Sequence, residues 1–257
     1  MNPIRLVTFD ALHTIITPRL PIYVQYSQVF EPYLGRLPPD CIKQSFNVAL
    51  RSTQEKHPSY EKGAKHWWCE VIRCTALDAG ANEQLLNTHL DDIVDTLMIR
   101  FSSRTGYKAF DDAIPTIRHL REKLGIRTAI ISNADSRIRA VLTDLEFPDY
   151  LKPVILSEEE GIEKPSRHIF VRALGTVNRE AGSTYGQIFP NQCLHVGDEL
   201  TSDYNGAKAS GWNALLLRRQ GIEGECEHKE PDETLKNVRI INRLDAIINW
   251  IQRHGTC

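Results

Sequence analysis

Three short apolar runs that each end in polar residues constrain the fold of this chain more than any other feature. They cover residues 4–9, 128–131 and 193–196. Apolar runs of this length, bounded by polar breaks, are typical of strands buried in a sheet. Asp10 ends the first run, Ser132-Asn133 the second and Gly197-Asp198 the third. A carboxylate at the end of a buried strand is unfavourable unless a cation, a metal ion or hydrogen-bond donors pair with it. The alternative for Asp10 is a turn-forming residue.

From Phe110 onward, predicted strands alternate with predicted helices. The strands are expected over 128–131, 153–156, 193–196, 214–217 and 238–241, and the helices over 113–124, 136–145, 167–174, 204–210 and 244–250. Such alternation is typical of α/β proteins, in which helices cover both faces of a parallel sheet. The fold class predicted is therefore α/β, with a Rossmann-like parallel sheet. The acidic, polar stretch 221–237 is expected to be an exposed loop.

Between Pro18 and Gly106 the apolar residues recur with a helical period, and no run predicts a strand. Helices are expected over 23–34, from about 40, over 66–77 and after the N-cap Asn82. Trp67 and Trp68 are expected in the core of this helical block, since large aromatic side chains dominate packing. We predict that residues 1–17 and 107–257 form the α/β domain and that 18–106 form an inserted helical domain.

Composition excludes several classes of partner. The 257 residues suit one domain with an insertion, and 31 basic residues nearly balance 33 acidic ones, without a basic stripe. We therefore expect neither nucleic-acid binding nor a membrane-binding face. The first run begins at Ile4, which leaves no room for a signal peptide. Six cysteines without a CxxC pair favour a reducing compartment. We expect a soluble, intracellular protein of the cytoplasm or nucleus; the sequence does not predict its oligomeric state.

The three polar strand ends are predicted to meet in one pocket. In an open α/β sheet, ligands bind outside the carboxyl ends of the strands. Lys164, in the segment Gly161-Ile-Glu-Lys-Pro165, follows the second of these ends and can reach the same pocket. Two carboxylates, a hydroxyl with adjacent backbone amides and a lysine suit a phosphate group together with Mg²⁺, which is usually held by one or two carboxylates.

At these positions the chain resembles the haloacid dehalogenase (HAD) superfamily. Asp10-Ala-Leu-His-Thr14 is similar to the superfamily's first motif, DxDx(T/V), and Ser132 to its second. Lys164-Pro165 resembles the third motif, and Gly197-Asp198 with Asp203 resembles the fourth, GDxxxxD. The motifs are individually weak, but all four occur in order at strand ends. The helical block lies where the superfamily's α-helical C1 cap is inserted.

The resemblance implies a role for each residue. Asp10 would be the nucleophile and form an aspartyl-phosphate. Asp10, the backbone carbonyl of Leu12 and Asp198 would bind Mg²⁺, supported by Thr14 and Asp203. Ser132, Asn133 and Lys164 would bind phosphate, and Lys164 would also neutralise charge on Asp10. Alternatives remain open: Ser132 and Asp203 can each cap a helix, and packing roles are expected for His195 and Trp212.

One departure from the superfamily pattern concerns catalysis. Phosphatases of the superfamily carry a second Asp two residues after the nucleophile, and here Leu12 occupies that position. General acid–base catalysis typically raises the rate by about 10²–10⁴-fold. The neighbouring His13 is a weak substitute, because a side chain one residue further along the chain usually points in another direction. We predict a Mg²⁺-dependent phosphatase that acts on a small phosphorylated metabolite. The alternatives are a dehalogenase, a phosphonatase using Lys56, Lys62 or Lys65, and a catalytically weak binding or scaffold protein.

Overall fold

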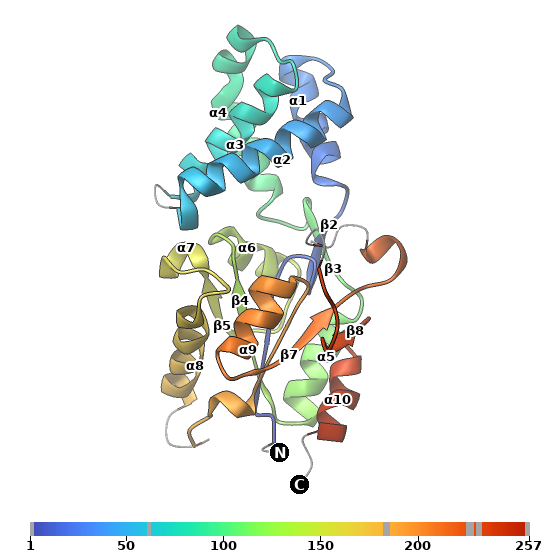
Figure 1. The fold of residues 1–257 in the computed structure, drawn as a ribbon. Helices are drawn as coiled ribbons and strands as arrows, with labels where there is room; N and C mark the ends of the chain where they lie inside the picture. The colour runs from blue at the N-terminus through green and yellow to red at the C-terminus, as the bar shows by residue number, and fades with distance from the viewer. Residues whose placement is uncertain (1–2, 61–62, 182–185, 225–228, 230–232, 255–257) are drawn as a thin grey trace. The chain divides into compact units, whose positions relative to one another are not determined.

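The computed structural model describes residues 3–60, 63–181, 186–224, 229 and 233–254 (Figure 1). Their contacts divide the chain into two compact units. The sheet unit comprises Met1–Thr17, Ala109–Ala134 and Glu146–Cys257, and the helical unit comprises Pro18–Lys108 and Asp135–Leu145. The assignment of core and cap functions to parts of the chain stays a prediction.

A six-stranded parallel sheet forms the centre of the sheet unit, which confirms the α/β prediction. Its order is β5-β4-β1-β6-β7-β8, and every pairing in it is parallel. The central strand β1 pairs Leu6 with Arg127 of β4 on one side and with Cys193 of β6 on the other. The strands are β1 (Leu6–Phe9), β4 (Arg127–Ser132), β5 (Leu151–Leu156), β6 (Cys193–Gly197), β7 (Asn213–Leu217) and β8 (Ile240–Ile241).

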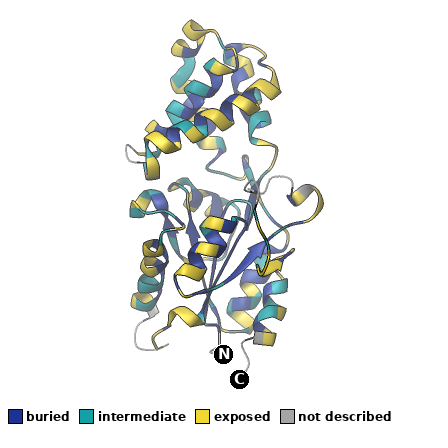
Figure 2. Ribbon diagram, viewed as in Figure 1, coloured by how far each residue is buried: buried dark blue, intermediate teal, exposed yellow. Residues whose placement is uncertain are grey.

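Both faces of the sheet are buried, which explains why its strands are almost continuously apolar (Figure 2). On one face, Leu6 belongs to a core cluster that includes Phe170 of α8 and Ala207 of α9. Trp212 is buried in the same cluster with its ring 5.4 Å from that of Phe170, so its predicted packing role is confirmed. The helical segments of this unit include α5 (Ala113–Arg118), α7 (Ser157–Glu160), α8 (Arg167–Ala181), α9 (Gly206–Ala209), α10 (Ala246–His254), and the π-helical turns His119–Lys123 and Leu200–Asn205.

The helical unit has its own hydrophobic core. Trp67 is buried in it, as predicted, whereas Trp68 is half-buried and donates from Nε1 to Asp135 Oδ2 at 2.8 Å. The predicted N-cap Asn82 accepts from the backbone N–H of Leu85 at 3.0 Å. The helices are α1 (Ile22–Leu34), α2 (Pro39–Lys56), α3 (Ala64–Asp78), α4 (Glu83–Arg100) and α6 (Arg137–Asp144).

A small two-stranded sheet was not predicted. It pairs β2 (Ile16–Pro18) with β3 (Tyr107–Ala109). Strands of three residues are too short to show a period of two, so no pattern indicated them. In the part of the chain that the structure describes, no helix combines the length and the apolar character needed to cross a membrane.

Candidate active site

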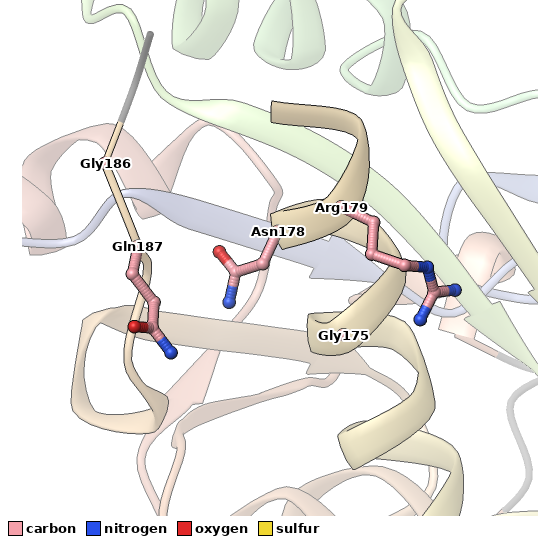
Figure 3. Close-up of a pocket in the computed structure, with 5 residues that line it drawn as sticks. All are labelled: Gly175, Asn178, Arg179, Gly186 and Gln187. Carbon is pink, nitrogen blue, oxygen red and sulfur yellow. The ribbon is translucent and has the colours of Figure 1, made fainter. Parts of the chain in front are cut away.

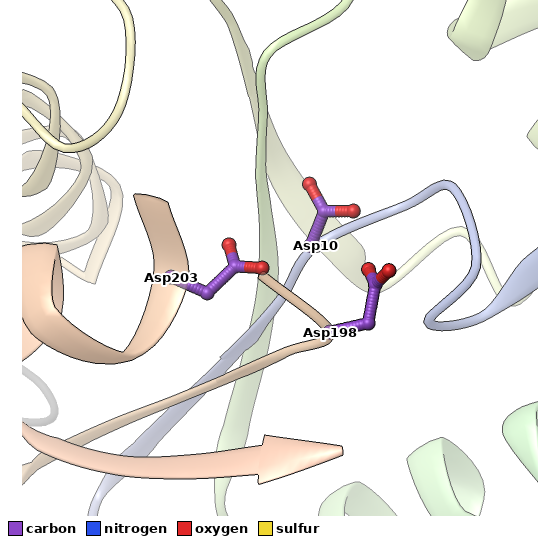
Figure 4. A group of neighbouring side chains, drawn as sticks. All are labelled: Asp10, Asp198 and Asp203. Carbon is purple, nitrogen blue, oxygen red and sulfur yellow. The ribbon is translucent and has the colours of Figure 1, made fainter. Parts of the chain in front are cut away.

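The two acids that end neighbouring strands of the sheet lie together. Asp10 follows β1 and Asp198 follows β6, and these strands are paired in register from Leu6 and Cys193 onward. With Asp203, they form a group in which one carboxylate oxygen from each residue lies within 4.8 Å of the other two (Figure 4). All three side chains are buried, so the cluster must be neutralised from inside the protein or by a bound cation.

Lys164 supplies part of that neutralisation. Its Nζ donates to Asp10 Oδ1 and to Asp203 Oδ1, each at 2.6 Å, and its side chain is only 2% exposed. The side chain of Asn133 holds the backbone of the same lysine, because its Oδ1 accepts from Lys164 N at 2.7 Å and its Nδ2 donates to Lys164 O at 2.9 Å. Asn133 therefore links the end of β4 to the loop that carries the lysine, a role that the sequence did not predict.

Asp203 is held by three donors. Lys164 Nζ and His195 Nε2 reach its Oδ1 at 2.6 and 3.0 Å, and the backbone N–H of Glu199 reaches its Oδ2 at 2.9 Å. Asp203 thus fixes the position of the lysine and also accepts the backbone N–H of Glu199; because Glu199 is the N-cap of the turn Leu200–Asn205, Asp203 does not cap this turn. Gly197 makes this possible, since a Cβ there would lie 2.1 Å from Asp203 Cγ.

Burial and pairing set the ionisation of the cluster. Burial, assisted by the charges of Asp203 and Glu199, raises the pKa of Asp10 to about 6 against the opposing effect of Lys164. Burial also disfavours the charged form of Asp203, but Lys164 and His195 outweigh it and lower the pKa of that carboxyl. For Lys164 the two carboxylates outweigh the cost of burial and raise the ammonium pKa. Of Asp10, Lys164 and Asp203, Asp10 is therefore the residue whose pKa lies closest to neutral pH.

His195 packs in the core, as expected, but it also supports the site. Its ring is buried edge-on against Phe170, and burial lowers its pKa, which favours neutral imidazole. Because Asp203 is an acceptor, Nε2 carries the proton, while Nδ1 accepts from the hydroxyl of Thr8 at 2.8 Å. A polar histidine on a buried strand, two residues before Gly197, was the one sequence signal for this supporting role. Nothing in the sequence pattern indicated that its partner is Asp203.

Around Asp10, the predicted supporting residues take up distinct positions. The hydroxyl of Thr14 donates to Asp198 Oδ1 at 3.3 Å. Ser132 is the buried last residue of β4, and because the next helix begins at Arg137 with Ser136 as its N-cap, Ser132 does not cap it. Leu12 is half-buried, and His13 has a left-handed backbone with φ 58°. Phosphate binding by Ser132 and Asn133, and metal binding by the Leu12 carbonyl, stay predictions.

The donor set fits Mg²⁺. Carboxylate oxygens are ligands that this ion prefers, and it commonly uses one or two of them. Three internal donors already engage Asp203, which makes Asp10 and Asp198 the better candidates for direct ligands and Asp203 a support for Lys164. The family resemblance implied the same division, and the metal-binding roles of Asp10 and Asp198 stay predictions.

A pocket of about 310 Å³ is lined by Gly175, Asn178, Arg179, Gly186 and Gln187 (Figure 3). Arg5, which precedes β1, donates to Gln187 O at 2.9 Å, so the pocket lies near the amino end of that strand rather than beside Asp10. Asn178 uses its amide on the backbone of Ile188. Among the described residues, none of the predicted site residues lines this pocket.

Comparisons with known proteins agree with this architecture. An uncharacterised hydrolase of Schizosaccharomyces pombe is 32% identical over 83% of this chain and 90% of its own length. Haloacid dehalogenase-like hydrolase domain-containing protein 3 of Homo sapiens is 29% identical over 83% of this chain and 82% of its own. Both similarities extend over most of each chain, so they concern the whole architecture rather than one motif.

Solved structures share the fold at lower identity. A 2-haloacid dehalogenase from Pseudomonas syringae has a TM-score of 0.62 at 21% identity, covering 98% of this chain and 99% of its own. The HAD-hydrolase YfnB of Bacillus subtilis, solved with bound magnesium, has a TM-score of 0.64 at 16% identity, covering 98% and 100%. The family described as haloacid dehalogenase-like hydrolase matches residues 4–211. With its four motifs brought to one edge of a parallel sheet, the chain belongs to this family of hydrolytic enzymes.

Proposed function

We propose that this protein is a Mg²⁺-dependent phosphatase that acts on a small phosphorylated molecule. The observation that carries the proposal is the buried pair Asp10 and Asp198, beside a lysine whose ammonium already contacts Asp10. Buried carboxylates in such proximity need a further cation, and a divalent metal ion would offset the excess negative charge that the three carboxylates have over Lys164. Asp10 and Asp198 would hold the ion, together with the Leu12 carbonyl. When bound, the ion would neutralise charge on the transferring phosphoryl group.

Asp10 is the proposed nucleophile. Lys164 occupies Oδ1 of Asp10, which leaves Oδ2 to attack phosphorus. A bond forms between Oδ2 and phosphorus as the bond from phosphorus to the leaving oxygen breaks, and the departing group takes the electron pair. Water then cleaves the aspartyl-phosphate to release inorganic phosphate and restore Asp10. The Ser132 hydroxyl, the backbone amide of Asn133 and the Lys164 ammonium are proposed to contact phosphate oxygens, since the Asn133 side chain is engaged with the Lys164 backbone.

Leu12 limits the substrates that such a site can process. A leucine cannot protonate a departing alkoxide, nor can it activate water in the second step. An aryl leaving group departs without much protonation, so aryl phosphates should react faster than alkyl phosphates. The aspartyl-phosphate should accumulate, because its hydrolysis lacks a base.

The alternative hydrolytic functions have less support. A metal-independent dehalogenase has no need of Asp198 beside its nucleophile, although solved dehalogenases share the fold. A phosphonatase needs a neutral lysine to form a Schiff base. Lys65 is exposed and paired with Asp95 at 2.7 Å, which raises its pKa and keeps it charged. Lys56 is exposed on α2, and Lys62 lies outside the described residues.

The test compares the purified full chain with Leu12→Asp on p-nitrophenyl phosphate and glycerol phosphate, in Mg²⁺ and in EDTA. We expect Leu12→Asp to raise the turnover of glycerol phosphate by about 10²-fold or more, within the range of a general acid. Leu12→Asn is the matched control, since it is polar and of similar size but cannot exchange a proton. Asp198→Asn should weaken Mg²⁺ binding in calorimetry.

Two results would contradict the phosphatase proposal. One is a Leu12→Asp variant that folds and binds Mg²⁺ normally yet hydrolyses neither phosphate faster than the original chain. The other is release of chloride from 2-chloropropionate in EDTA, without phosphatase activity in Mg²⁺, which would establish the dehalogenase instead.

A further inference from the structure

Two consecutive arginines lie at the site edge of the sheet and have no role in the chemistry proposed above. Arg218 and Arg219 directly follow β7, which pairs in parallel with β6. Asp198 follows β6, so the acid and the two arginines leave neighbouring strands at the same edge. Like the acids, the arginines follow the carboxyl end of a parallel strand, where ligands bind in open α/β sheets.

Arg219 is an almost fully buried guanidinium with a defined set of contacts. Its side chain is 1% exposed and donates to both carboxylate oxygens of Asp112, at 3.1 and 2.9 Å. Its Nη2 also donates to the backbone carbonyl of Thr14 at 3.1 Å, and its guanidinium lies 3.7 Å from the ring centre of Phe110. A planar, forked donor that stacks on an aromatic ring has little freedom to reorient, so the Thr14 carbonyl is held at a fixed place.

The Thr14 contact leads directly to the acidic cluster. The same residue that gives its carbonyl to Arg219 gives its hydroxyl to Asp198 Oδ1 at 3.3 Å. The loop that contains it is compact, since the N–H groups of Ile15 and Ile16 both donate to Ala11 O at 3.0 Å. Arg219 thus restrains one end of a short loop whose other end is the nucleophile Asp10.

Arg218 contacts the backbone of Asp198, whereas Thr14 contacts its side chain. Arg218 Nη1 donates to the backbone carbonyl of Asp198, and its Nη2 donates to both carboxylate oxygens of Glu233, at 2.9 and 2.6 Å. The Arg218 side chain is 11% exposed. The two arginines therefore restrain Asp198 twice, once at its own carbonyl and once through Thr14.

Charge shows that these contacts serve position rather than neutralisation. Arg219 faces two carboxylates, Asp112 and, at 3.6 Å, Glu223, and Arg218 faces Glu233, so the arginines add no net positive charge to the site. We propose that Arg219, supported by Arg218, is a positioning residue that fixes the loop 11–16 and thereby the distance between the Asp10 and Asp198 carboxylates. The purpose of that arrangement, metal binding, rests on the proposed function. Loss of a residue that orients a metal ligand typically weakens metal affinity by about 10–100-fold.

The experiment uses the full chain with Arg219→Met and Asp112→Asn combined. Removing the whole buried pair avoids an uncompensated charge, and the asparagine keeps an acceptor for Leu244 N–H, which Asp112 Oδ2 binds at 2.8 Å. In metal-free protein, hydrogen exchange of the Ile15 and Ile16 amides should accelerate on the order of tenfold, the factor that one lost hydrogen bond gives. Calorimetry should show a Kd for Mg²⁺ about 10–100-fold weaker.

Controls separate this role from general destabilisation. Arg243→Met with Asp245→Asn removes an exposed Arg–Asp pair at 3.2 Å and should change neither readout. Thr14→Val should weaken Mg²⁺ binding similarly, and adding it to the Arg219 variant should cause little further loss, because both act through one contact chain. Arg219→Lys should not rescue the loop, since lysine lacks the fork.

Unchanged exchange in the loop 11–16 would overturn the inference, and so would an unchanged Mg²⁺ affinity in the double variant. If the original chain itself binds no Mg²⁺, the proposed function fails. The exchange measurement, which needs no metal, then decides the role of Arg219 by itself.

Discussion

Replacing Lys164 by methionine should be among the most destabilising single changes in the sheet unit. The ammonium contacts Asp10 and Asp203 at 2.6 Å each, and the lysine and Asp203 side chains are at most 2% exposed. Methionine has a similar length, so little packing is lost, but two buried carboxylates lose their cation. Removing one partner of a buried ion pair costs about 3–5 kcal/mol, and we expect a loss of that size at pH 8.

The loss should shrink as the pH falls. Without Lys164, burial and mutual repulsion raise the folded-state pKa of both acids above their unfolded values. Such groups destabilise the fold fully above the raised pKa, and the penalty is relieved as protons bind below it. A pKa that is raised by about one unit corresponds to about 1.4 kcal/mol of that penalty. In the original chain, Lys164 and His195 outweigh burial and hold the pKa of Asp203 low. The stability that Asp203 contributes is therefore present above its unfolded pKa and is lost only in stronger acid.

Urea unfolding in EDTA at pH 8 and pH 5.5 measures both effects, with the loss taken from the midpoint at an unchanged m-value. Lys208→Met, at an exposed position on α9, is the matched control and should change the free energy of unfolding by less than about 0.5 kcal/mol. Adding Asp203→Asn to Lys164→Met should recover part of the loss. A loss below about 1 kcal/mol at pH 8, or an equal loss at both pH values, would show that Lys164 does not neutralise the two buried acids.

Two further predictions follow from other described residues. Gly197→Ala should displace Asp203, because its Cβ would lie 2.1 Å from Asp203 Cγ, and the resulting overpacking should cost at least about 1–3 kcal/mol in thermal or urea unfolding. Gly175→Ala in α8 is the control, since its Cβ meets only Arg179 Nη1 at 3.7 Å, and an equal effect at both glycines would contradict the steric argument. Burial raises the thiol pKa of Cys193, whereas Cys41 is exposed. Iodoacetamide should therefore modify Cys41 in the native protein and Cys193 only after unfolding, as read by peptide mass spectrometry, and rapid native labelling of Cys193 would contradict its burial.

The fold was predictable where the pattern extended over many residues. Strands β1, β4, β6 and β7 lie within a residue or two of their predicted ranges, because buried parallel strands are nearly continuous apolar runs. Helix α8 was predicted to end at Leu174, yet it continues through Gly175 to Ala181. Tertiary packing of Val177 against the sheet, where it is fully buried, outweighs the low helix propensity of that glycine.

The site was predictable as a set of residues but not as a network. Strand-end placement brought Asp10, Asp198 and Lys164 into one prediction, because the topology of a parallel sheet fixes where its ends meet. The contacts of Asn133 with the Lys164 backbone, and of His195 with Asp203, depend on side-chain directions that have no sequence period. Arg219 was missed for another reason, since its partners Asp112 and Thr14 are 107 and 205 residues away in the chain.

The central place of β1 determines when this enzyme can become active during synthesis. Strand β1 pairs with residues 127–130 on one side and with 193–196 on the other. Most of the chain must therefore leave the ribosome before both pairings of β1 can form beside Asp10. Helices α1 to α4 follow one another between residues 22 and 100 and pack together. They can therefore form before β1 has paired with either of its neighbouring strands. Contacts this distant in sequence close slowly. Until residues 193–196 have been made, β1 therefore keeps an unpaired apolar edge, and transient exposure of this kind favours aggregation.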